Sequence, residues 1–106
     1  LDLEFAVGEG PVIHNPVREA ADVARVRELA DIDRLAFVMD TVVATRAGLD
    51  DSIPVIGFAG APFTLAGYCI EGGTSKSWTL TKQFMMRHEA AWHDLCGKIA
   101  RAVSRY

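Results

Sequence analysis

Residues 54–76, PVIGFAGAPFTLAGYCIEGGTSK, constrain the fold more than any other part of the chain. Residues 55–59 are an apolar run without the alternation of apolar and polar side chains that a half-exposed strand shows. Such a run is typical of a strand covered on both faces, as in a parallel sheet. A glycine-rich turn follows, and Pro62 suits the first position of a helix, where its missing N–H costs nothing. This order of strand, turn and helix predicts an α/β protein.

Helical periodicity surrounds this segment on both sides. Apolar residues recur at helical spacing after Asp31, the expected N-cap, and Gly48 is expected as the left-handed residue that ends that helix. Gly72 and Gly73 are expected to end the helix that Pro62 begins. The helix nearest the end of the chain is the most amphipathic. Helices are therefore predicted over residues 31–48, 63–71, 76–87 and 89–105.

The first thirty residues predict two short strands and a charged surface helix. Residues 1–7 alternate between apolar and polar side chains, residues 8–11 (GEGP) form a turn, and residues 11–14 suit a second strand. Asn15, followed by a proline, has the pattern of an N-cap. A helix is therefore expected over residues 18–29.

Composition excludes several classes of protein. The chain has 106 residues, of which 50% are hydrophobic and 24% are charged, and this excludes a disordered tail. Its net charge of −3 argues against nucleic acid as a partner, and its apolar runs are too short to cross a membrane. Cys69 and Cys96 form no C-x-x-C pair and are read as reduced thiols of a cytoplasmic protein. Because the chain opens at Leu1 rather than at methionine, we expect a piece of a larger protein.

The turn between the predicted buried strand and the next helix is the candidate binding site. Open α/β sheets and barrels bind ligands at the carboxyl ends of their strands. The first N–H groups of the helix, near Phe63 and Thr64, attract anions such as carboxylates. Gly57 and Gly60 leave room for a ligand near the backbone, and Tyr68 offers a phenolic donor. An alternative remains open, in which the glycines serve helix–strand packing and Tyr68 is a half-buried core aromatic.

The other chemically active residues show no catalytic or metal-binding spacing. The three histidines do not converge on a metal, so surface positions are expected for His14, His88 and His93. The chain has no G-x-G-x-x-G or P-loop spacing. The remaining candidates are expected to have structural rather than catalytic roles. Cys69 is expected to be a buried small side chain, Asp50 and Asp51 to form a solvated turn, and Trp78 and Trp92 to lie in the core.

Residues 57–73, GFAGAPFTLAGYCIEGG, resemble the signature of the uroporphyrinogen decarboxylase family. That signature is a G-F-x-G-x-P-aromatic-T-L stretch followed by a tyrosine and then by E-G-G, and every one of these positions is occupied here. The likeness extends upstream from Glu4 through Gly8-Glu9-Gly10-Pro11 to residues 16–18. Downstream it covers the helices that end in Arg87 and resume near His88. The resemblance therefore spans essentially the whole chain.

The resemblance implies a fold and an activity. Family members are (β/α)₈ TIM barrels, and at roughly 30 residues per unit this chain holds about three units of an incomplete barrel. Residues 1–106 are thus expected to be a fragment of a single barrel domain, inactive alone. The family enzyme is a carboxy-lyase of haem and porphyrin biosynthesis, which converts uroporphyrinogen III to coproporphyrinogen III by removing carbon dioxide from four acetate side chains. It uses no metal or organic cofactor, and its members are typically homodimers.

The resemblance carries only a few site residues over to this chain. Tyr68 matches the motif tyrosine that contacts the tetrapyrrole substrate, Phe58 matches a phenylalanine that lines the cleft, and Gly60 lies in the turn facing it. The family's central aspartate, its amino-terminal arginines, and its later serine and histidine fall outside the chain, so no catalytic residue or metal ligand is expected here. A substrate with eight carboxylates favours a positive cleft, whereas this chain is negative.

Two alternatives belong to other functional classes. A corrinoid-linked methyltransferase shares the barrel and uses zinc, but its zinc ligands would lie beyond this chain. The intact E-G-G after Tyr68 favours the decarboxylase. The other alternative is a self-contained helical module of 106 residues that binds a partner protein.

Overall fold

An antiparallel hairpin opens the chain in the computed structural model, which describes residues 1–8 and 10–106. Strand β1 (Leu3–Ala6) pairs with β2 (Gly10–Ile13), with Leu3 opposite Ile13 and Ala6 opposite Gly10. The two predicted strands are confirmed with slightly different bounds. The predicted turn at residues 8–11 includes Glu9, which lies outside the described residues.

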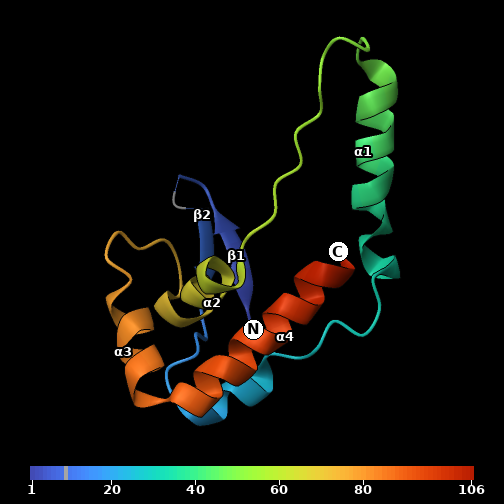
Figure 1. The fold of residues 1–106 in the computed structure, drawn as a ribbon. Helices are drawn as coiled ribbons and strands as arrows, with labels where there is room; N and C mark the ends of the chain where they lie inside the picture. Colours follow the sequence, from blue (N-terminus) through green and yellow to red (C-terminus); the bar gives the residue numbers. More distant parts are fainter. Residues whose placement is uncertain (9) are drawn as a thin grey trace.

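Helices α2 (Pro62–Glu71), α3 (Thr79–Arg87) and α4 (Glu89–Arg105) pack beside the hairpin (Figure 1). The predicted bounds of α4 are confirmed, and Pro62 is the first residue of α2 as expected. Gly72 ends α2 in the left-handed conformation, with φ of 86°. The core lies between these three helices and the chain around residues 17–23, and it consists of Val17, Val23, Ala66, Ile70, Phe84, Trp92, Leu95 and Ile99.

The helix expected over residues 18–29 is replaced by a short 3₁₀ helix, η1 (Ala20–Arg25). The predicted N-cap at Asn15 is wrong, because its side-chain oxygen instead accepts the backbone N–H of Asp2 at 2.7 Å. Residues 16–18 are not helical, and the N–H of Val17 bonds instead to the carbonyl of Cys69 at 2.8 Å. Val17 is completely buried next to α2, and η1 begins only at Ala20.

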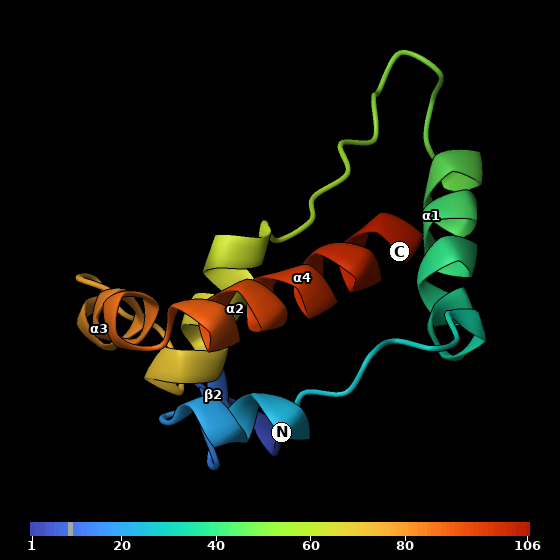
Figure 2. The ribbon, with the colours of Figure 1, turned by 60° about the horizontal axis from the view of Figure 1, so that its bottom comes forward.

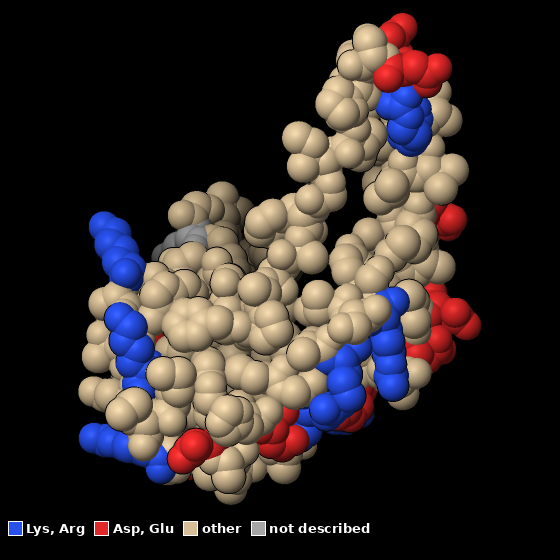
Figure 3. All heavy atoms as spheres, in the orientation of Figure 1, with Lys and Arg blue, Asp and Glu red and all other residues tan. Residues whose placement is uncertain are grey.

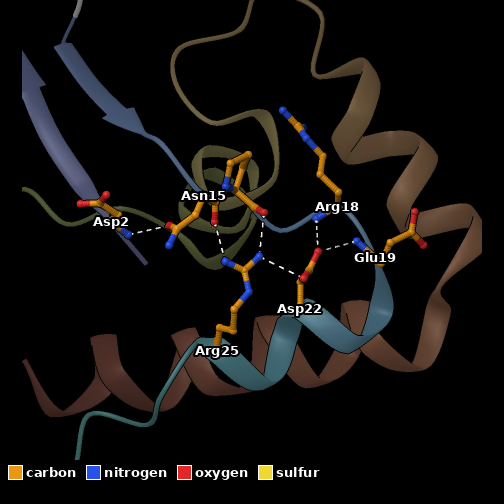
Figure 4. A network of polar contacts seen from close by, with 7 residues as sticks. Asp2, Asn15, Arg18, Glu19, Asp22 and Arg25 are labelled. Atoms are coloured by element: carbon orange, nitrogen blue, oxygen red, sulfur yellow. Dashed lines mark hydrogen bonds and ion pairs between the residues drawn. The ribbon is translucent and has the colours of Figure 1, made fainter.

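A network of polar contacts fixes the start of η1 (Figure 4). One carboxylate oxygen of Asp22 accepts the backbone N–H groups of Arg18 and Glu19, each at 2.9 Å. The guanidinium of Arg25 donates to the carbonyls of Asn15 and Pro16, each at 2.9 Å, and lies 3.0 Å from the other oxygen of Asp22. Bonds from the backbone of Glu19 and Arg18 lower the pKa of Asp22, so its negative charge is stabilised.

Helix α1 (Ala36–Gly48), preceded by the 3₁₀ helix η2 (Asp33–Leu35), lies beyond the C-terminal end of α4, away from α2 and α3 (Figure 2). The N-cap expected at Asp31 is wrong, because η2 begins at Asp33 after Ile32 and α1 begins only at Ala36. The carboxylate of Asp31 nevertheless accepts the N–H of Asp33 at 2.8 Å, just before the first turn. Gly48 is the last residue of the helix and is not left-handed, so that prediction is wrong. The extended backbone of Leu49 ends the helix instead. None of residues 36–48, all of which are described, is buried.

Residues 55–59 are not the buried strand that their sequence predicts. Within the described chain they pair with no other strand, and Ile56 and Phe58 are 87% and 94% exposed. A buried strand needs neighbours on its edges and faces, and the hairpin strands already pair with each other. The segment instead crosses open space between α1 and α2 (Figures 1 and 2).

The overall shape is correspondingly open. The radius of gyration is 16.1 Å, whereas a compact domain of this length has about 13 Å. The described residues form a mixed, helix-rich structure with a two-stranded antiparallel sheet, and no closed barrel is present among them. Among residues 1–8 and 10–106, none of the helices combines the length and apolar character needed to cross a membrane.

Candidate functional site

The turn before α2 is packed tightly against the helix that follows it. A Cβ atom on Gly60 would lie only 2.7 Å from Cδ2 of Leu65, so a larger residue would displace that side chain. The first helical bond runs from the N–H of Leu65 to the carbonyl of Ala61 at 3.1 Å. The N–H groups of Phe63 and Thr64 therefore precede the first intrahelical bond and can receive an anionic group. Gly60 therefore allows the turn to pack closely against Leu65 of α2.

Phe58 and Gly60 share an apolar groove of about 300 Å³. The groove lies where the segment before α2 approaches the C-terminal end of α4 and the chain around η2. Figure 3 shows uncharged residues bordering the hollow between the rest of the chain and the arm formed by α1 and residues 49–61, with many of the charged groups along the lower edge. The other lining residues are Leu29, Leu35, Ala59, Leu65, Ala102, Val103 and Tyr106.

Tyr68 lies within α2 and away from this groove. It is four residues after Thr64, so the two side chains share one face of the helix, opposite the buried face that carries Ala66 and Ile70. Tyr68 is half-buried and is not among the described residues that line the groove of Phe58 and Gly60. The structure thus brings two of the three predicted binding residues together and places the third separately.

The ring of Tyr68 belongs to a cluster of aromatic side chains. It meets the edge of Trp78 at a centroid distance of 5.7 Å and an interplanar angle of 76°. Phe63 lies 6.2 Å from Trp78 and 5.9 Å from Trp92, again in edge-on geometry. Trp92 is a core residue as predicted, whereas Trp78 is only half-buried.

The E-G-G sequence joins the elements around α2. Glu71 accepts both the backbone N–H and the hydroxyl of the buried Thr81, each at 3.0 Å, and so holds the first turn of α3. The carbonyl of Gly72 accepts the N–H of Ile13 at 2.8 Å. Gly73 also lies close to the hairpin, because a Cβ atom on Gly73 would lie 3.4 Å from the carbonyl oxygen of Pro11.

Arg18 is a contributor to this junction that the sequence reasoning missed. Its guanidinium donates to the carbonyl of Ile70 and, at 3.3 Å, to that of Glu71. These are carbonyls of the last turn of α2, which lack intrahelical partners and favour a cation. The only signal in the sequence was that Arg18 lies within the upstream part of the family resemblance.

Comparison with known proteins decides the family. All 106 residues match the profile of the family described as Uroporphyrinogen decarboxylase (URO-D). The chain belongs to the uroporphyrinogen decarboxylase family. The resemblance read from residues 57–73 is therefore confirmed.

Curated relatives named uroporphyrinogen decarboxylase match along nearly the whole chain. The protein from Sorangium cellulosum is 51% identical over 102 residues, which cover 96% of this chain and 29% of the relative. The proteins from Chloroflexus aggregans and Thermus thermophilus are 46% and 43% identical over 106 residues, which cover all of this chain and 30% of each relative. The chain thus spans about 30% of the length of the curated relatives it matches.

The histidines and thiols of this family member show no metal-binding arrangement. Each histidine has its own carboxylate: His14 lies 2.8 Å from Glu4, His88 lies 3.5 Å from Glu19, and His93 lies 4.0 Å from Glu89. No group of three or more potential ligands gathers in the part of the chain that the structure describes. Burial raises the pKa of the thiols of Cys69 and Cys96, which disfavours the nucleophilic thiolate.

Proposed function

We propose that this chain is part of a longer uroporphyrinogen decarboxylase, which removes carbon dioxide from the four acetate side chains of uroporphyrinogen III to give coproporphyrinogen III. One observation carries the proposal: the complete signature at residues 57–73 lies inside a family match over residues 1–106. Relatives that carry this name extend well beyond the matched region.

The same proposal includes a (β/α)₈ barrel, to which residues 1–106 contribute about three units of a single domain. Residues 55–59 are a strand of that barrel, paired on both edges with strands from the rest of the protein. The exposure of Ile56 and Phe58 and the absence of any buried residue on α1 support this, because both segments have apolar side chains without partners.

The reaction needs no cofactor, because the substrate is its own electron sink. A pyrrole ring that is protonated on carbon becomes a cation, and it receives the electron pair released when a carboxylate leaves as carbon dioxide. The protein has to hold the tetrapyrrole, stabilise this cation and place proton donors near it.

Within this chain, Tyr68 binds and orients the substrate, and Phe58 and Gly60 border its cleft. A phenolic O–H donates a hydrogen bond to a substrate carboxylate without adding charge. Phe58 is 94% exposed and supplies an apolar surface for the macrocycle. The position of Tyr68 and Thr64 on the face of α2 away from the core supports this role, because a ligand can reach that face. The positive charge that eight carboxylates require comes from other parts of the protein.

The assembly and location follow the same family expectation. We expect the full-length protein to be a homodimer in the cytoplasm, with the tetrapyrrole as its small-molecule ligand and without a nucleic-acid or membrane partner. Gel filtration with light scattering of the full-length protein measures the oligomeric state directly.

The activity is tested with the purified full-length protein under anaerobic conditions. Uroporphyrinogen III is supplied with a chelator present, and the products are oxidised and separated by their number of carboxylates. We expect stepwise loss of four carboxylates. A protein that leaves uroporphyrinogen unchanged, or that transfers methyl groups from a methylcorrinoid only when zinc is supplied, contradicts the proposal and favours the methyltransferase.

Residues 1–106 alone are the matched control. They are expected to show no turnover, because most of the barrel and the central aspartate of the family lie outside them. A monomeric 1–106 chain in which α1 unfolds together with α2, α3 and α4 in one cooperative transition would instead favour the self-contained binding module.

A further inference from the structure

Trp78 has an unusual backbone conformation. Its φ and ψ are 53° and 40°, and it is the only residue other than glycine with positive φ in the described chain. A bulky side chain rarely adopts this left-handed region, because its Cβ then crowds the neighbouring carbonyl. Such strain costs about 1–3 kcal/mol and persists only where the surrounding structure enforces it.

Several contacts hold Trp78 in this conformation. The hydroxyl oxygen of Ser75 accepts the backbone N–H of Trp78 at 3.0 Å, and the carbonyl of Trp78 accepts the N–H of Lys82 at 3.0 Å to begin α3. Glu71 holds the same turn of α3 through Thr81. The short loop after α2 therefore delivers the indole ring back onto α2.

Gly67 makes room for that ring. A Cβ on Gly67 would lie 2.6 Å from Cε3 of Trp78, a distance that real Cβ atoms essentially never show. Glycine within a helix costs about 1 kcal/mol relative to alanine, so α2 loses stability by having it here. The ring of Trp78 thus lies directly on the α2 backbone, one residue before Tyr68.

From this geometry we propose that Trp78 is a positioning residue for Tyr68, and this inference rests on the proposed function. Its ring meets Tyr68 edge-on at 5.7 Å and restricts the rotation of the phenol about its side-chain bonds. The hydroxyl of Tyr68 is thereby held on the outer face of α2 before substrate arrives. Strain at Trp78 and the glycine at Gly67 are the two costs of this arrangement.

The test is a double-mutant cycle in the full-length protein, with kcat/KM for uroporphyrinogen III as the readout. Tyr68→Phe removes the hydroxyl, and we expect a loss of about 10- to 150-fold. Trp78→Leu keeps apolar volume over Gly67 but removes the aromatic edge, and we expect a loss of about 2- to 12-fold. Trp78→Phe keeps an aromatic ring and is expected to restore most of the activity.

The double variant separates positioning from stability. If Trp78 acts through the hydroxyl of Tyr68, Trp78→Leu lowers kcat/KM by less than about twofold in the Tyr68→Phe background. An equal loss in both backgrounds overturns the inference and assigns Trp78 a structural role. Trp92→Phe is the control, because Trp92 contacts Phe63 as Trp78 does, and its effect is expected to be the same in both backgrounds.

The outcomes also distinguish this inference from the proposed function. A native protein without decarboxylase activity, or a Tyr68→Phe variant with unchanged kcat/KM, overturns the site and the inference together. A strong effect of Tyr68→Phe with no effect of Trp78→Leu overturns the inference alone. Should Trp78→Leu fail to fold, Trp78→Met in the two backgrounds provides the same cycle, because methionine also keeps apolar volume over Gly67 without the aromatic ring.

Discussion

The two halves of the molecule use their apolar residues in opposite ways. Around the hairpin, α4 buries Leu95 completely and α2 buries Ile70 to 1% exposure. In the arm formed by α1 and residues 49–61, by contrast, Val43 is 68% exposed and Ile56 is 87% exposed. Both halves have regular apolar patterns in the sequence, so the pattern itself does not distinguish them.

The difference lies in where the partners come from. The faces of α2, α3 and α4 meet one another and η1, all within this chain (Figure 2). In the arm, by contrast, no residue of α1 is buried in the described chain, and residues 58–60 meet α2 and α4 only at the apolar groove. An amphipathic pattern therefore predicts which face of an element is buried, but it does not show whether the covering element belongs to the same stretch of chain.

The largest expected effect comes from removing a core side chain. Leu95→Ala in residues 1–106 should lower the free energy of unfolding by about 2–5 kcal/mol, because a completely buried leucine leaves a cavity. Val43→Ala on the exposed face of α1 is the matched control and should change it by less than about 0.5 kcal/mol. Chemical denaturation measures both, and equal losses would contradict the contrast between the two halves.

The junction formed by Glu71 is expected to matter next. Glu71→Ala leaves the hydroxyl and N–H of the buried Thr81 without their acceptor, and we expect a loss of about 1–3 kcal/mol. Glu4→Ala is the control, because Glu4 meets His14 at the exposed surface, where ion pairs contribute about 0–1 kcal/mol. Thermal unfolding of both variants of the full-length protein compares them. If Glu71→Ala destabilises the protein no more than Glu4→Ala does, the bonds from Thr81 to Glu71 do not contribute measurably to stability.

A smaller substitution tests whether the arm gains partners in the full-length protein. Ile56→Val should cost about 0.5–1.5 kcal/mol there if residues 55–59 become a covered barrel strand. In residues 1–106 the same change should have almost no effect, since Ile56 is 87% exposed. Denaturant titration of the full-length protein and of residues 1–106, each with and without Ile56→Val, makes the comparison. No effect in either would count against the barrel strand.

Sequence reasoning succeeded where structure is decided by neighbouring residues. Pro62 at the start of α2, left-handed Gly72 at its end and the bounds of α4 all follow from local preferences. The cap at Asn15 failed because the N–H of Val17 bonds instead to the carbonyl of Cys69, which is distant in sequence. No short-range pattern reports such a contact.

The same contrast between local preferences and contacts distant in sequence applies to the candidate site. The motif pointed to Phe58, Gly60 and Tyr68, but it did not show that Trp78 covers Gly67 and meets Tyr68. A glycine in the middle of a helical pattern was the available signal, since such a glycine often marks a close approach. The separation of Tyr68 from the groove of Phe58 and Gly60 depends on the arm, whose partners are not within the described chain.

The smallest expected effect is a pH dependence confined to the half around the hairpin. Backbone N–H groups of Glu19 and Arg18 lower the pKa of Asp22, so the folded chain binds a proton there less readily than the unfolded chain. A lowered carboxyl pKa contributes stability that is present above the unfolded value, near pH 4, and is lost as the pH falls through the folded value. Asp22→Asn should therefore flatten the fall in unfolding midpoint between about pH 5 and pH 2. Asp40→Asn on α1 is the control for the loss of one carboxylate, because Asp40 lies outside the Asp22 network. If both variants keep the native slope, the Asp22 network does not contribute to acid sensitivity.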